Sequence, residues 1–275
     1  MAFALFKYGR AAVGATGRLQ RHLSTAGAAA ENAAVRRDLA ASHRALDRLH
    51  LNEGICNHLS ALAPARSGQG QVMLLAPFHQ GFGEVTPESL LGLNLDGEVV
   101  EGVGQPELSA FSIHLGLRQS RPGPRTSCVF HTHMPYATAL ACLKDPRLRM
   151  VHQNSLRFHQ RVSYDTEYAG LATALAEGQR LGRKLGDAAV LFMGNHGVLV
   201  VAETVAEAFD STYYLERACM AQVMAQWTGQ PLAEMSPEQC QQMAPVMQAA
   251  ARELAGPHLD YVARQLARHD SLLSN

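Results

Sequence analysis

Three histidines have the sequence surroundings expected of metal ligands. His131 and His133 end an apolar, β-branched run that begins at Cys128, and on an extended strand residues at this spacing point to the same face. His196 lies between glycines in Gly194-Asn-His-Gly197, at a tight turn between two apolar runs, where a side chain is well placed to reach into a site. Three neutral imidazoles that leave one position open are the arrangement of a catalytic zinc ion. The pattern therefore predicts one divalent metal ion bound by His131, His133 and His196.

The composition of the chain limits what else the protein can be. Its 275 residues suffice for one large domain with a sizeable core, and 17% charged and 47% hydrophobic residues are ordinary for a globular protein. The formal net charge of +0 argues against nucleic acid or an anionic membrane as a partner, and no apolar run reaches the roughly 18 residues of a membrane span. The five cysteines form no C-x-x-C pair, which indicates reduced thiols rather than a disulfide framework. Because the chain has 13 histidines, one His-x-His pair can arise by chance, and the third histidine strengthens the metal prediction.

Residues 1–30 differ in composition from the rest of the chain. They are basic and rich in alanine and small hydroxyl residues, and the first acidic residue is Glu31. Residues 21–25 have the character of a matrix-protease cleavage region. This composition predicts a mitochondrial transit peptide and a mitochondrial protein; the alternative is a disordered basic tail on a cytoplasmic one. In either case we expect the folded domain to begin at residue 31.

Hydrophobic periodicity predicts an α/β protein. Helical patterns cover residues 31–51, 107–119, 136–143, 171–185 and 204–227. Strand patterns cover residues 55–63, 72–76, 188–193 and 198–202 as well as the run that starts at Cys128, and Asp96-Gly97 predicts a hairpin turn. Two further helices, 237–254 and 258–268, are expected on the outside. The predicted organisation is thus a leader (1–30), a domain (31–235) and a C-terminal helical extension (236–275).

Several motifs occur in an order found in one known family. They are Asn57-His-Leu-Ser-Ala61, Glu84-Val-Thr-Pro-Glu-Ser-Leu90, Leu95-Asp-Gly-Glu-Val-Val100, Phe111-Ser-Ile-His114, Val129-Phe-His-Thr-His-Met-Pro135 and Gly194-Asn-His-Gly197. Through them the chain resembles the class II aldolase and adducin head-domain family over roughly residues 35–230. Asn57-His-Leu-Ser60 and Glu84-Val-Thr86 make it more similar to the adducin-like branch than to the phosphosugar aldolases.

The resemblance implies a three-layer α/β/α sandwich around a largely antiparallel sheet, assembled as a homotetramer. It assigns the three histidines to one divalent metal, commonly zinc, which binds the carbonyl and hydroxyl oxygens of a small hydroxy-carbonyl, sugar-like substrate. The metal then stabilises the enediolate formed when the carbon–carbon bond breaks. Asn57 and Ser109 match polar substrate-binding positions of the family.

The sequence departs from the family at the group that moves the proton. In the enzymes this carboxylate lies four residues before the histidine that matches His114, and this chain has Ala110 there. Glu107, about one turn earlier, is our candidate for the catalytic acid–base, since residues three apart share a helix face. The alternative is that Glu107 only stabilises the helix dipole. Tyr164 and Asp165 are then the next candidates.

Two functions remain open. The first is a metal-dependent carbon–carbon lyase of the class II aldolase type, or a related isomerase or decarboxylase. Phe78 and His79 stand where the aldolases bind phosphate partly through a Thr-Gly pair, which argues against a phosphosugar substrate. The second function is a non-catalytic, adducin-like oligomeric module that binds cytoskeletal proteins. We favour the enzyme, because the sequence shows no long basic tail of the kind with which adducins engage actin and spectrin.

The leader generates a direct prediction. If it is a transit peptide, the mature protein should begin near residue 25 and reside in mitochondria, because such segments are removed after import. N-terminal sequencing of the protein isolated from its own cells, together with cell fractionation, tests this. An intact Met1 on a cytosolic protein would contradict it.

Overall fold

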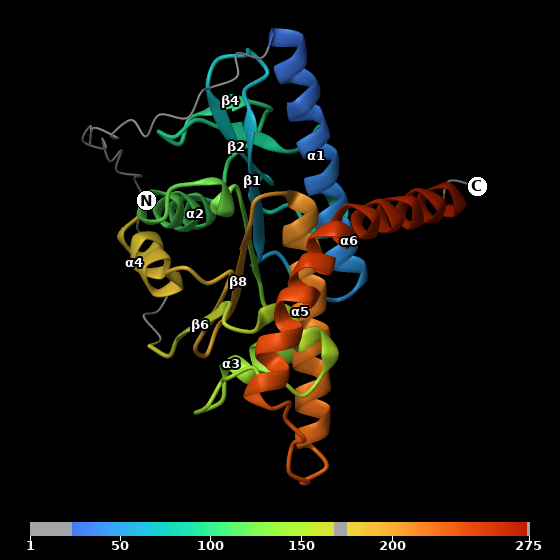
Figure 1. The fold of residues 1–275 in the computed structure, drawn as a ribbon. Helices are drawn as coiled ribbons and strands as arrows, with labels where there is room; N and C mark the ends of the chain where they lie inside the picture. Colours follow the sequence, from blue (N-terminus) through green and yellow to red (C-terminus); the bar gives the residue numbers. More distant parts are fainter. Residues whose placement is uncertain (1–23, 168–174, 274–275) are drawn as a thin grey trace.

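The computed structural model describes residues 24–167 and 175–273. In this part of the chain one sheet of eight strands has the order β4-β3-β2-β1-β5-β8-β7-β6. Every neighbouring pair of strands is antiparallel except β6 and β7, which are parallel. Figure 1 shows the sheet edge-on with helices on both sides. The predicted α/β class with a largely antiparallel sheet is confirmed.

The elements have the following bounds. The strands are β1 (His58–Pro64), β2 (Gln71–Leu75), β3 (Leu91–Leu93), β4 (Val99–Glu101), β5 (Cys128–Thr132), β6 (Val162–Asp165), β7 (Val190–Met193) and β8 (Gly197–Ala202). The helices are α1 (Thr25–Arg48), α2 (Leu108–Ser120), α3 (Pro135–Ala141), α4 (Leu175–Leu185), α5 (Val205–Gln226) and α6 (Pro237–Leu273), with short 3-10 helices η1 (Phe82–Glu84), η2 (Pro124–Thr126) and η3 (Gln153–Phe158). None of the described helices combines the length and apolar character that a membrane crossing demands.

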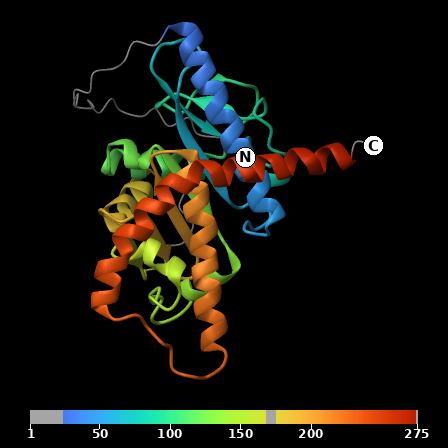
Figure 2. The same ribbon diagram turned by 45° about the vertical axis from the view of Figure 1, so that its right-hand side comes forward.

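Helices form a layer on each face of the sheet (Figures 1 and 2). On one face, α2 and α4 pack through a cluster that includes Ile113 and Val129 of β5. On the other face, α1, α3 and α5 pack through a larger cluster that includes Phe209 and Phe130 of β5. Because side chains alternate along a strand, His131 faces the same layer as Val129. The three-layer architecture therefore turns one histidine of the His-x-His pair toward α2.

The first helix begins earlier than the sequence predicts. α1 starts at Thr25, and the side chain of Ser24 caps it by accepting a hydrogen bond from the amide of Gly27 at 3.2 Å. Ala28 is buried at 1% exposure, so the fold includes residues that the predicted boundary at 31 assigned to the leader. The boundary was wrong because an alanine-rich stretch has high helix propensity but no amphipathic pattern. Residues 1–23, which carry most of the predicted leader, lie outside the described residues.

One helix, α6, replaces the two predicted C-terminal helices. It has 37 residues and contains Pro245 and Pro257. Each proline removes one backbone donor, which bends a helix without ending it where packing holds the turns on either side. The ribbon changes direction along its length, and its last part extends away from the body of the domain (Figures 1 and 2).

Buried charges bind α6 to the domain. Asp210 of α5 accepts a hydrogen bond from Arg157 at 2.6 Å and lies 2.8 Å from Nδ1 of His258 in α6. The guanidinium of Arg157 also stacks 3.7 Å above the ring centroid of Tyr214. Leu259 of α6 belongs to the larger core cluster. The C-terminal helix is therefore partly integrated into the core.

A buried ion pair fixes α1 to the edge of the sheet. Arg36 is 1% exposed, and its guanidinium donates to Glu101 of β4 at 2.7 Å and to the carbonyl of Leu90 at 2.5 Å. Burial lowers the pKa of Arg36, and the hydrogen bond to Glu101 opposes that shift. Since a buried guanidinium without its carboxylate is strongly unfavourable, this pair holds the N-terminal helix in place.

Replacing Glu101 tests this contact. Glu101→Gln should lower the free energy of unfolding by about 3–5 kcal/mol, because it leaves the charge of Arg36 buried and uncompensated. Urea unfolding measures the change. The matched control is Asp187→Asn, which breaks the exposed pair with Arg125 (side chains 60% and 94% exposed) and should cost under about 1 kcal/mol. Equal small effects in both variants would show that the buried pair does not hold α1.

Candidate metal centre

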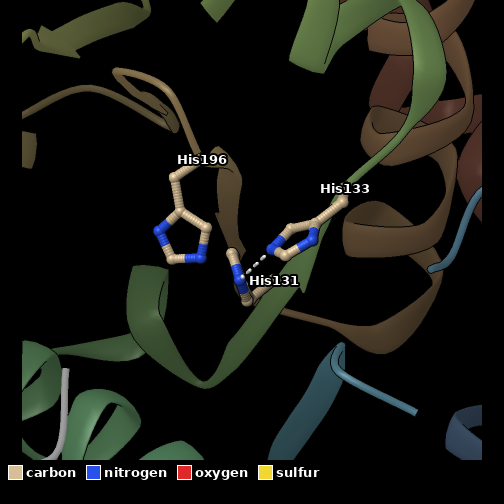
Figure 3. Close-up of side chains that lie close together, drawn as sticks. All are labelled: His131, His133 and His196. Carbon is tan, nitrogen blue, oxygen red and sulfur yellow. Dashed lines mark hydrogen bonds between the residues drawn. The ribbon is translucent and has the colours of Figure 1, made fainter. Parts of the chain in front are cut away.

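His131, His133 and His196 lie together where β5 ends and β7 turns into β8 (Figure 3). Their nitrogen ligand atoms are within 4.8 Å of one another, and the ring centroids are 4.8–4.9 Å apart in the three pairs. Nε2 of His131 and Nε2 of His133 are 3.1 Å apart. Two nitrogens at about 2.0–2.1 Å from one tetrahedral zinc ion lie about 3.3 Å from each other, so the spacing fits a shared ion.

The second nitrogens of the two rings show that both Nε2 atoms carry lone pairs. Nδ1 of His131 is 3.0 Å from the carbonyl oxygen of Val198, which can only accept, so Nδ1 carries the hydrogen. Nδ1 of His133 is 2.6 Å from a carboxylate oxygen of Glu53, and the same argument applies. In the neutral rings, Nε2 therefore faces Nε2 with no hydrogen between them. A cation between the two lone pairs resolves this repulsion, so the donors fit a metal.

Local backbone structure sets the positions of the ligands. β5 ends after Thr132, and Pro135 occupies the first turn of α3, so the chain turns directly behind His133. Asn195, with φ of 55°, makes the left-handed corner of the β7–β8 turn that carries His196. A Cβ at Gly197 would lie 2.6 Å from Cδ2 of His133, so only glycine allows the two ligand segments to approach this closely.

Burial favours the neutral form that binds metal. Together with neighbouring imidazoles, it lowers the pKa of His196 to about 4 and that of His131 well below 6.5. Burial also lowers the pKa of the adjacent His58 to about 4, although the carboxylate of Glu107 opposes that shift. Because protonated imidazole cannot bind a metal ion, these shifts keep His131 and His196 available at neutral pH.

Asn57, a predicted substrate-binding residue, lies directly beside a ligand. Its Oδ1 accepts hydrogen bonds from the backbone amides of His133 at 3.2 Å and Glu53 at 2.8 Å. Its Nδ2 is buried and has no partner among the described residues. Asn57 therefore links the His133 segment to the Glu53 segment and keeps one amide donor unused. Glu53 was missed by the sequence analysis, since nothing in its own neighbourhood indicates a link to a residue 80 positions away.

Glu107 and Ser109, also predicted site residues, hydrogen-bond to each other. Glu107 is the N-cap of α2: its carboxylate accepts from the amides of Ser109 at 3.1 Å and Ala110 at 2.5 Å. The hydroxyl of Ser109 donates to the same carboxylate at 2.7 Å. The helix-stabilising role is thus present, and the helix that Glu107 caps carries His114, which contacts His58 beside the ligand His131.

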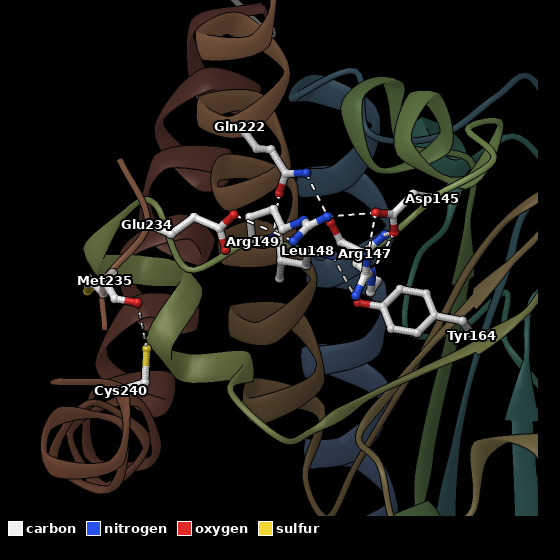
Figure 4. A network of polar contacts seen from close by, with 9 residues as sticks. All are labelled: Asp145, Arg147, Leu148, Arg149, Tyr164, Gln222, Glu234, Met235 and Cys240. Carbon is white, nitrogen blue, oxygen red and sulfur yellow. Dashed lines mark hydrogen bonds and ion pairs between the residues drawn. The ribbon is translucent and has the colours of Figure 1, made fainter. Parts of the chain in front are cut away.

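The two reserve candidates for the proton-transfer group are occupied by other contacts. The hydroxyl of Tyr164 accepts from the amide of Leu148 at 2.9 Å, in a network with Asp145 and Arg147 that holds the loop after α3 (Figure 4). Asp165 is 2% exposed and accepts from Arg180 at 2.6 Å. Both groups serve the structure around β6.

His58 is the main residue that the sequence analysis left without a role. It pairs with His131 in the β1–β5 ladder, and the two ring centroids are 4.8 Å apart. Its Nδ1 is 2.8 Å from Nε2 of His114 on α2. A usable signal was present: His58 and Ser60 share a strand face, and His114 and Arg118 share a helix face four residues apart.

Comparison with known proteins assigns the family. The chain belongs to the class II aldolase and adducin N-terminal domain family, whose sequence profile matches residues 37–223. A relative from Caulobacter vibrioides, named "Putative aldolase class 2 protein", is 32% identical over 205 residues, covering 74% of this chain and 77% of the relative. Human beta-adducin is 33% identical over 156 residues, which are 55% of this chain but only 21% of beta-adducin. The predicted membership is confirmed, with relatives named for both branches.

Solved structures agree with the fold. An aldolase II superfamily protein from Pseudomonas syringae superposes with a TM-score of 0.76 at 28% identity, covering 87% of this chain and 94% of that one. The L-fuculose 1-phosphate aldolase from Glaciozyma antarctica gives a TM-score of 0.73 at 21% identity, over 89% of this chain and 93% of that one. At 21% identity, the similarity to the L-fuculose 1-phosphate aldolase shows a shared fold and nothing about activity.

The metal centre predicts how single ligands behave. His131→Ala should weaken zinc binding by more than about 10²-fold, beyond the 10–100-fold that loss of an outer partner costs. Metal analysis of the dialysed protein and competition with a chelator measure this. The control is His159→Ala, a half-buried histidine outside the cluster, which should keep wild-type zinc content. Full zinc content in His131→Ala would rule out the proposed ligand set.

Proposed function

We propose that this chain is a metal-dependent carbon–carbon lyase of the class II aldolase type that acts on a small hydroxy-carbonyl compound. The observation that carries the proposal is the opposition of two Nε2 lone pairs, on His131 and His133, at 3.1 Å beside His196. Zinc is the proposed metal, because three imidazole donors with an open position suit it. Family resemblance and leader composition extend the proposal to a homotetrameric, mitochondrial enzyme.

A divalent metal held by these histidines would supply a Lewis acid for negative charge on the substrate oxygens. The chain's own groups would bind and orient the substrate. The unpartnered Nδ2 of Asn57 is one donor available to a substrate oxygen, because buried polar atoms seek a partner.

The surroundings of α2 support a substrate without phosphate. The amide of Phe78 donates to the carbonyl of Gln105 at 2.8 Å, which puts Phe78 next to the segment leading to Glu107. Its ring lies against that of His79, tilted by 33° with centroids 3.7 Å apart, and the side chain of Phe78 is 48% exposed. His79 keeps a left-handed φ of 69°, the conformation that a glycine would adopt easily. An aromatic pair at this corner suits an uncharged part of a substrate better than a phosphate.

Glu107 is the proposed proton-transfer group. Such a group must come within about 3 Å of its target, directly or through one water. Its carboxylate opposes the lowering of the pKa of His58, and a substrate hydroxyl would compete with Ser109 for one of the two oxygens. In this proposal one carboxylate both caps α2 and exchanges a proton with the substrate.

A non-catalytic binding module is the second candidate, and one observation favours it. At the position where the resemblance places the catalytic carboxylate, Ala110 is fully buried in a cluster with Met73 and Leu75. A chain with this substitution could keep the metal as a structural element and act through its surface. The similarity to human beta-adducin is consistent with that alternative.

Substitution of Glu107 separates capping from catalysis. Glu107→Asn should cut turnover by roughly 10²–10⁴-fold, the usual contribution of general acid–base catalysis. It should leave zinc content and the free energy of unfolding nearly unchanged, because asparagine is a good N-cap. Release of carbonyl products from a panel of hydroxy-carbonyl compounds by the zinc-loaded protein measures turnover.

The control for this experiment is Glu253→Gln, which removes an exposed acid on α6 and should retain full activity. If Glu107→Asn kept wild-type turnover, a group other than Glu107 would have to transfer the proton. A zinc-loaded wild type that is inert on the whole panel would favour the binding module.

A further inference from the structure

A chain of hydrogen bonds runs from the interior to the metal centre. Nη2 of Arg118 is 2.9 Å from Oγ of Ser60, and Oγ of Ser60 is 2.6 Å from Nδ1 of His114. Nε2 of His114 is 2.8 Å from Nδ1 of His58, whose ring packs against His131. The chain reaches the metal centre through a residue that is not a ligand.

Arg118 sets the direction of the hydrogens. A guanidinium has N–H donors and no acceptor, so Arg118 donates to Ser60. Ser60 is fully buried, and its hydroxyl has only Arg118 and His114 within hydrogen-bonding distance among the described side chains and backbone. The hydroxyl hydrogen therefore goes to Nδ1 of His114, which must offer a lone pair. If His114 instead donated from Nδ1 to Ser60, the hydroxyl hydrogen of Ser60 would be buried without an acceptor, at the full desolvation cost of an unpaired donor.

The tautomer of His114 in turn determines the tautomer of His58. A neutral imidazole that accepts at Nδ1 carries its hydrogen on Nε2, so His114 donates to Nδ1 of His58. By the same rule, His58 carries its own hydrogen on Nε2. No side chain among the described residues hydrogen-bonds to that nitrogen. His58 thus differs from His131 and His133, because its remaining nitrogen offers a hydrogen rather than a lone pair.

The position of His58 indicates which group accepts a hydrogen bond from its Nε2–H. Its ring centroid lies 4.8 Å from that of the ligand His131 and 4.7 Å from that of His114 on α2. The ring therefore lies between α2 and the ligand His131. An oxygen of a molecule bound at the open metal position would be the natural acceptor.

We propose that Arg118, Ser60 and His114 are positioning residues that hold His58 with its hydrogen on Nε2, and that His58 donates this hydrogen bond to a substrate oxygen at the metal centre. The inference rests on the proposed function and deepens it. The substrate class is one whose carbonyl or hydroxyl oxygen gains negative charge during reaction, since a fixed donor stabilises such charge. His58 keeps its proton throughout and is not the general base.

The first test reads the tautomer directly and needs no activity. ¹⁵N NMR of the full-length, metal-free protein labelled at histidine distinguishes protonated from unprotonated ring nitrogens, and the spectrum of His58→Gln assigns the His58 signals. We expect a protonated Nε2 and an unprotonated Nδ1 in the wild type. We expect Ser60→Ala, which removes the hydroxyl donor, to give a mixture of both tautomers. A wild-type His58 with its hydrogen on Nδ1 would overturn the proposal.

The second test measures how much the hydrogen bond from His58 contributes to the binding of glycolate, a small hydroxy-acid used as the probe. Calorimetry on zinc-loaded protein should show glycolate binding roughly 10–100-fold weaker in His58→Met, the range for loss of a hydrogen bond to a charged acceptor. His58→Gln, which restores an N–H near the same place, should recover most of that affinity. Equal affinity in His58→Met and wild type, or no recovery in His58→Gln, would overturn the donor role. Absence of zinc binding in wild type would instead remove the proposed function, while the NMR result still decides the tautomer.

Discussion

The structure around the candidate site depends on two imidazole lone pairs that face each other. His131 and His133 each give their Nδ1 hydrogen to an oxygen, of Val198 and Glu53 respectively, so in their neutral forms neither ring places a hydrogen between the two Nε2 atoms 3.1 Å apart. Such an arrangement is unfavourable in a protein alone and favourable around a cation. The outer contacts thus do as much as the ligands to define a metal site.

The sheet makes these outer contacts possible. Antiparallel pairing of β5 with β8 brings Val198 opposite Thr132 and turns its carbonyl to His131, while pairing with β1 sets His58 opposite His131. Gly197 lets the β7–β8 turn approach His133. Strand register, rather than loop conformation, therefore aligns segments that are more than 60 residues apart in the sequence.

Much of this could be predicted from sequence, for identifiable reasons. The ligands His131, His133 and His196 follow local patterns, and the sheet and helices follow hydrophobic periodicity. The start of α1 could not be placed, because alanine gives helix propensity without an amphipathic signal. The continuity of α6 through Pro245 and Pro257 depends on packing against α1 and α5, which sequence periodicity does not contain.

The roles of single polar groups were the hardest to predict. Glu107 caps the helix that carries His114, and only the hydrogen bonds to Ser109 and Ala110 reveal the cap. His58 gains its importance from His114 on another element, 56 residues away in sequence. Such contacts between elements depend on tertiary geometry and have no local signature.

The central claim is that three imidazoles of this chain share one metal ion. X-ray absorption at the zinc edge of the zinc-loaded, full-length protein tests it most directly. The account predicts one zinc per chain with three imidazole nitrogens at about 2.0–2.1 Å and one further light-atom ligand. A spectrum dominated by sulfur ligands, or no bound zinc at saturating concentration, would contradict it.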